Sequence, residues 1–136
     1  MRTHIEFRSS KFPAQEGEDQ LINPGRFGRS LAEYLKTRLL DQGIETGELV
    51  AEDWGWVVPV KNDAFPLWVG CGNYEEYPDG FLCFIEPKKP TVHRLFRSID
   101  TTADVERVAD ALDQILRADT AIRELRWWTV AEVDRG

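Results

Sequence analysis

The sequence predicts an α+β fold: a single two-layer domain over residues 1–136, with a mainly antiparallel sheet of about four to six strands and two amphipathic helices packed on one face. Three observations support it. Two segments repeat apolar residues at helical spacing, so each has one apolar stripe to bury. Three successive apolar segments in the middle of the chain are joined by short turns, which favours antiparallel hairpins. The length suits one hydrophobic core better than two.

The first third of the chain predicts a strand, a loop and a helix. Residues 3–8 alternate polar and apolar side chains, which is typical of a half-buried strand. Residues 9–23 are rich in polar residues, proline and glycine and are expected to form a surface loop. Asn23-Pro24 can cap and open a helix. Leucines then recur every four residues, so the helix is predicted over 24–42, with Gly43 as its left-handed stop.

The middle of the chain predicts three consecutive strands, over 54–61, 65–73 and 81–86. The tetrapeptides at 61–64 and 77–80 carry the Asn, Asp, Pro and Gly residues that form turns. A short strand is also expected within 44–50, and 91–99 is expected to return as one more strand.

The last third predicts one long helix followed by less regular structure. Apolar residues from Val105 to Leu116 follow the i, i+3, i+4, i+7 pattern, and threonine and aspartate stand at the start, so a helix is predicted over 102–118. One further helical turn is expected within 121–125 and a strand around 127–130. The final residues are expected to be frayed.

Charge and composition exclude some classes of partner. The formal net charge is −7, and residues 41–86 contain ten acids against a single base, Lys61. This distribution argues against nonspecific nucleic-acid binding and against binding to anionic membranes. There is no apolar run of membrane-spanning length, no secretion-type leader and no cysteine framework, so we expect a cytoplasmic protein.

Cys71 and Cys83 do not form a recognisable catalytic or metal-binding pattern. A hairpin turn centred on Pro78-Asp79 predicts that the two thiols point to opposite faces of the sheet, which disfavours a disulfide. With His93 they lack the paired spacing of zinc ligands. We therefore predict no catalytic residue, no metal and no cofactor, and we lean against an enzyme.

The predicted central strands are apolar on both faces. One face can pack under the helices. The other must be covered by residues 9–23 and the Trp127-Trp128 segment, be covered by a partner, or form an exposed patch. Aromatic side chains ringed by acids resemble the centre and rim of a protein interface. The expected partner-binding residues are Trp54, Trp56, Trp68, Tyr74, Glu75, Glu76, Tyr77 and Asp79.

These features lead to one preferred function and two alternatives. We expect a non-enzymatic cytoplasmic protein-binding domain (an adaptor, an immunity-like protein or an inhibitor) whose protein partner carries a basic patch. The first alternative is a small enzyme or anion-binding protein that uses Arg26, Arg29 and Ser30 at the first helix N-terminus. The second is a homo-oligomer that pairs its apolar sheet faces.

Overall fold

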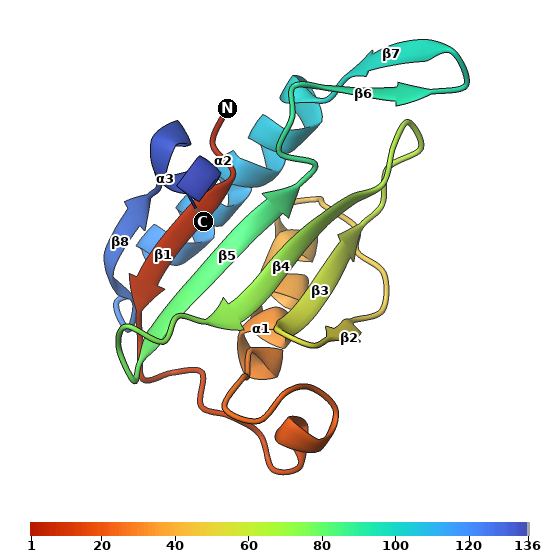
Figure 1. The fold of residues 1–136 in the computed structure, drawn as a ribbon. Coiled ribbons are helices and arrows are strands. Elements are labelled where there is room, and N and C mark those ends of the chain that lie inside the picture. The colour runs from red at the N-terminus through yellow and green to blue at the C-terminus, as the bar shows by residue number, and fades with distance from the viewer. Residues whose placement is uncertain (136) are drawn as a thin grey trace.

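A six-stranded antiparallel sheet covered on one face by two helices forms the body of the protein (Figure 1). The computed structural model describes residues 1–135, and it confirms the predicted α+β architecture. The strands follow the order β2-β3-β4-β5-β1-β8. They are β1 (His4–Arg8), β2 (Val50–Glu52), β3 (Gly55–Val60), β4 (Leu67–Asn73), β5 (Gly80–Glu86) and β8 (Arg123–Trp127). The covering helices are α1 (Arg29–Asp41) and α2 (Thr102–Ala118).

The hydrophobic core lies between the sheet and these two helices. Strands β1, β3, β4 and β5 send every second side chain toward the helices, as strand geometry requires. The largest fully buried side chains include Phe7, Leu31, Leu35, Phe81, Ile85 and Leu112. Burial of this apolar surface, at about 25 cal/mol per Å², is the main favourable term that holds the two layers together.

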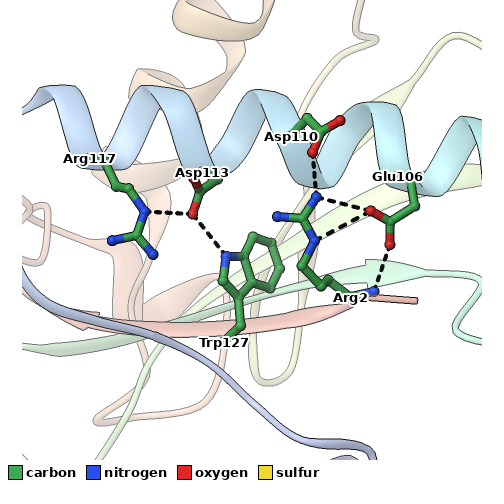
Figure 2. Close-up of polar contacts among 6 residues, drawn as sticks. All are labelled: Arg2, Glu106, Asp110, Asp113, Arg117 and Trp127. Carbon is green, nitrogen blue, oxygen red and sulfur yellow. Dashed lines mark hydrogen bonds and ion pairs between the residues drawn. The ribbon is translucent and has the colours of Figure 1, made fainter.

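Helix α2 has the bounds that its apolar spacing predicts, and polar contacts tie it to the first and last strands (Figure 2). The Arg2 guanidinium pairs with Glu106 at 2.9 Å and also with Asp110. One turn further on, the indole N–H of Trp127 donates to Asp113 at 3.0 Å. Arg2, just before β1, and Trp127, at the end of β8, therefore hold α2 against this side of the sheet.

The first helix begins at Arg29, so the predicted start at Pro24 is wrong. Residues 23–26 form a turn closed by the Arg26 N–H, which donates to the Asn23 carbonyl at 3.1 Å. The backbone then runs against β4, where a Cβ at Gly28 would lie 2.5 Å from the Cys71 carbonyl oxygen. This close approach to the sheet holds residues 27 and 28 out of the helix.

Other segments also differ from the sequence-based expectation. Residues 44–50 contribute only an isolated bridge between Thr46 and Val60 before β2 begins. Residues 91–99 form no additional sheet strand. They belong to a separate hairpin of β6 (Thr91–Arg94) and β7 (Arg97–Asp100) that projects from the body (Figure 1).

The C-terminal segment is more regular than expected. Part of the predicted helical turn at 121–125 lies in β8, because this segment pairs with the free edge of β1. A short helix, α3 (Val130–Arg135), follows. The Glu132 backbone N–H donates to the Thr129 hydroxyl at 3.2 Å, and the Thr129 backbone N–H donates to the Glu132 carboxylate at 2.9 Å. This is a capping box, for which Thr-x-x-Glu is the typical spacing.

The register between β4 and β5 overturns the predicted placement of the thiols. Two successive turns, closed by the Tyr77 and Gly80 N–H groups, make the loop odd in length. Cys71 therefore stands directly opposite Cys83, and both are buried, free thiols on the helix-covered face. The contact with the Cys83 thiol and complete burial raise the pKa of Cys71 well above its ordinary value. Cys71 is therefore held as a neutral thiol and is not activated as a nucleophile.

Candidate functional site

The sheet face that the helices leave uncovered carries a continuous row of aromatic rings. Trp54 and Trp68 stack with centroids 6.2 Å apart, and Phe84 contacts both of them, at 5.0 and 5.6 Å. The row then continues through His4, Trp128 and Tyr74, with successive ring centroids 5.5, 5.5 and 6.1 Å apart. We call the aromatic row the set Trp68, Trp54, Phe84, His4, Trp128 and Tyr74.

Sheet order explains why these rings meet. Gly70, Phe84 and His4 stand opposite one another on β4, β5 and β1 and point to the same face. The Trp128 N–H then donates to the His4 carbonyl at 2.8 Å, which extends the line beyond β8. Gly70 has a specific role here, because a Cβ at this position would lie 2.4 Å from the Phe84 ring and 2.8 Å from Trp54. Its missing side chain lets both rings lie over β4.

His4 contributes the imidazole ring of the aromatic row. It is 8% exposed and stacks between Phe84 and Trp128, with centroids 5.5 Å from each. Its Nδ1 lies 2.9 Å from the Thr3 hydroxyl oxygen. Burial, together with the nearby Lys88 charge, lowers the pKa of His4 to about 4. At neutral pH the imidazole is therefore an uncharged member of the aromatic row.

His4, near the middle of the aromatic row, is buried, and the five other rings are half-buried. Trp128 and the α3 segment lie over the β1 end, whereas Trp127 turns to the helix side. The 9–23 loop does not cover the row, so that expectation is wrong. The loop closes the core below α1, where Phe12 is buried against Phe7 and Phe81 (Figure 1). The Trp54–Trp68 end stays half-buried and accessible.

Acidic side chains surround this accessible end. Glu86 stands opposite Trp68 in the β4–β5 register, and Glu52 and Asp53 come directly before Trp54. Among the described residues 1–135, none of these three carboxylates forms an ion pair. Beyond Tyr74, Glu75 pairs with Arg26 at 3.4 Å. The Trp54–Trp68 end is thus an apolar centre bordered by three carboxylates that form no ion pair within residues 1–135, with Arg26 and Arg94 also beside it.

The predicted partner-binding residues divide into three groups. Trp54, Trp68 and Tyr74 belong to the aromatic row. The loop residues Glu75, Glu76 and Tyr77 are exposed beside it, and Asp79 accepts from Arg8 and Arg123 at the far end of the hairpin. The third group is a single residue, Trp56.

The expectation that Trp56 shares this surface is wrong. Trp56 is 4% exposed, lies on the helix-covered face, and donates its indole N–H to Glu18 at 2.7 Å. Trp54 stands outside β3, in the tight turn before it, so strand alternation does not relate the two rings.

Three members of the row were not among the predicted partner-binding residues. The alternation of β5 places Phe84 opposite in direction to Cys83 and Ile85, so its face was readable from the sequence. His4 and Trp128 join the row only because β1 lies between β5 and β8, and no local pattern reveals that order.

The alternative anion site at the start of α1 holds a carboxylate from the chain itself. The N–H groups of Gly28 and Arg29 both donate to Glu18 Oε2 at 2.8 Å. Ser30 donates to the Pro13 carbonyl, and the Arg29 guanidinium lies over the Trp56 ring at 5.0 Å. An external anion would have to displace Glu18, so this geometry does not favour that prediction, which remains untested.

Two searches of the described residues bear on other classes of function. Residues 1–135 contain no cluster of three or more His, Cys, Asp or Glu side chains arranged to hold a metal ion. None of the helices in that same part of the chain is long and apolar enough to cross a membrane.

Comparison of the chain with protein-family models, with curated proteins and with solved structures found no match. What the protein does is therefore inferred from the chemistry of its own surface.

Proposed function

We propose that this protein is a non-enzymatic, cytoplasmic protein-binding domain whose aromatic row receives a partner with a basic patch. The observation that carries the proposal is the half-buried Trp54–Trp68–Phe84 stack on the sheet face opposite α1 and α2. Aromatic rings in a fixed arrangement contribute much of the binding energy at protein interfaces, because they bury large areas with little loss of side-chain freedom.

The rim supports a basic partner. Glu52, Asp53 and Glu86 border the stack without an intramolecular cation within ion-pair distance in residues 1–135. A lysine or arginine of a partner would find these carboxylates unpaired. Rim charges of this kind raise the association rate and make it depend on salt, whereas the buried aromatic centre sets the dissociation rate.

The test compares capture of partners by wild-type protein and by matched variants at low and high salt. Trp68→Ser removes one ring of the aromatic stack, and the double variant Glu52→Lys/Glu86→Lys reverses the charge of two of the bordering carboxylates. Leu40→Ser and Glu16→Lys are the controls, since they make the same kinds of change at exposed positions away from the aromatic row. Circular dichroism and melting establish that each variant folds.

The expected result is a partner whose binding weakens with salt, is retained by both controls, falls at least about tenfold for Trp68→Ser, and loses its salt dependence in the charge-reversal variant. A partner that binds the Trp68 and rim variants as tightly as it binds the controls would place recognition on another surface and refute the proposal.

A further inference from the structure

We propose that the aromatic row also receives a second copy of this chain, through the tip of the β6–β7 hairpin. This inference rests on the proposed function, because it names a partner for the same surface. Its evidence is the structure of the hairpin itself.

The hairpin presents two bare apolar side chains at its tip. Figure 1 shows β6 and β7 projecting beyond the end of the sheet. Val92 and Ile99 at the root pack partly against the core, so the arm is anchored. At the two-residue turn, Leu95 is 83% exposed and Phe96 is fully exposed, and they are the most exposed large apolar residues of the described chain.

The backbone of the turn is unfavourable for these residue types. Leu95 and Phe96 have φ of 49° and 65°, so both are left-handed. Two-residue hairpin turns with two left-handed positions strongly prefer Asn-Gly, because a Cβ is disfavoured there. The Leu-Phe pair therefore destabilises the turn and also exposes apolar surface that lowers solubility. Strain combined with exposed apolar surface points to a contact made outside the monomer.

The tip of the arm differs in charge from the rim of the aromatic row. The hairpin contains two arginines near its tip and one acid, Asp100, at its root, and Lys88 and Lys89 precede it, although the whole chain has a net charge of −7. Arg94 and Arg97 flank the tip on each side. An apolar pair between two arginines complements an aromatic stack bordered by Glu52, Asp53 and Glu86.

A groove for the tip lies beside the stack. It has a volume of about 500 Å³. One wall is formed by Phe65, Pro66, Trp68, Glu86 and Pro87, and the other by Val92, His93 and Arg94 of the hairpin. The hairpin borders this groove on its own subunit, where the Arg94 guanidinium donates to the Ala64 carbonyl at 3.1 Å. Because tip and groove lie at the same end of the molecule, one two-fold axis brings each tip to the other subunit's groove. Such an isologous arrangement closes at a dimer.

The test measures the mass of the purified full chain by light scattering and sedimentation over a wide concentration range, at low and high salt. Wild-type protein is expected to form a dimer whose dissociation constant rises with salt. The key variant is Leu95→Asn/Phe96→Gly, which gives the turn its preferred residues while removing the apolar tip. It is expected to melt at the same or a higher temperature and to dimerise at least about tenfold more weakly.

Two further variants test the receiving side. Glu86→Lys is expected to weaken self-association, and Leu40→Ser, an exposed apolar position on α1, is expected to leave it unchanged. Sedimentation with vesicles that contain phosphatidylserine tests a lipid surface as the occupant of the tip.

Three results would overturn the inference: a monomer at every concentration, a dimer that the tip variant leaves intact, or vesicle binding by a protein that stays monomeric in solution. None of them touches the proposed function, since that depends on capture of a foreign partner through Trp68. Conversely, if the protein forms a dimer that depends on the tip and captures no foreign partner, this inference is supported and the proposed function is refuted.

Discussion

The buried carboxylate of Glu18 gives a direct way to test how the fold is held together. Glu18 is 2% exposed and accepts four hydrogen bonds. Oε1 accepts from the Gln15 N–H at 2.9 Å. Oε2 accepts from the backbone N–H groups of Gly28 and Arg29 and from the Trp56 indole. One side chain thereby joins the 9–23 loop, the start of α1 and β3. Its negative charge at the helix N-terminus is favoured by the helix dipole.

The expected cost of Glu18→Ala follows from these bonds. A hydrogen bond to a charged group contributes about 1.5–3 kcal/mol net, and the contributions are not additive. Water admitted to the site would satisfy part of the freed helix N–H groups, but the Trp56 indole N–H is buried. We therefore expect a loss of about 3–5 kcal/mol in the free energy of unfolding, a large share of the roughly 5–15 kcal/mol typical of a domain.

Glu18→Gln separates charge from shape. The amide oxygen can keep the Oε2 bonds, but its NH2 group then faces the Gln15 N–H, donor against donor. We expect an intermediate loss of about 2–3 kcal/mol. Glu16→Ala is the matched control, since Glu16 is exposed in the same loop and its loss should stay within about 0.5 kcal/mol.

Urea unfolding followed by tryptophan fluorescence measures all three variants. A Glu18→Ala protein that loses less than about 1 kcal/mol, no more than an ordinary point substitution, would show that the carboxylate does not anchor the loop, and the reasoning above would fail.

Two further predictions concern the aromatic row. Unfolded His4 binds a proton below about pH 6.5 and folded His4 only below about pH 4, so its contribution is complete above pH 6.5 and is lost as pH falls toward 4. Urea unfolding across this window should show about 2–3 kcal/mol more acid destabilisation for wild type than for His4→Phe, and equal slopes would contradict the assigned burial. Gly70→Ala should cost about 1–3 kcal/mol and change the near-ultraviolet circular dichroism, because its Cβ would overlap the Phe84 ring. Gly47→Ala, whose Cβ meets Pro59 at an ordinary 3.5 Å, is its control, and equal effects of the two substitutions would count against a tightly packed row.

The parts of the fold that local patterns determine were predictable. Helix α2 has its predicted bounds because its apolar spacing and its first turn agree with its packing. The strands β3, β4 and β5 were found because turn residues separate them. The start of α1 was missed because Gly28 must approach Cys71, a contact between segments far apart in sequence.

The candidate site was also predictable only in part. Trp54 and Trp68 were identified from residue type and nearby acids. Trp56 was misplaced because alternation does not pass through the turn before β3. The thiols were misplaced because the loop between β4 and β5 is odd in length, which no single residue signals. Long-range register and sheet order depend on many weak contacts at once, and one sequence does not display them separately.

The place of β1 in the sheet bears on how the chain folds. The hairpins from β2 to β5 join neighbours in sequence and can form early. Strand β1, in contrast, pairs only with β5 and β8, through partners such as Ile5 with Cys83 and with Trp127. Closing such long loops is entropically costly, so these pairings form late and slow the folding rate. During synthesis the first strand therefore stays unpaired until β5 has emerged from the ribosome, and the sheet is completed only after translation of β8.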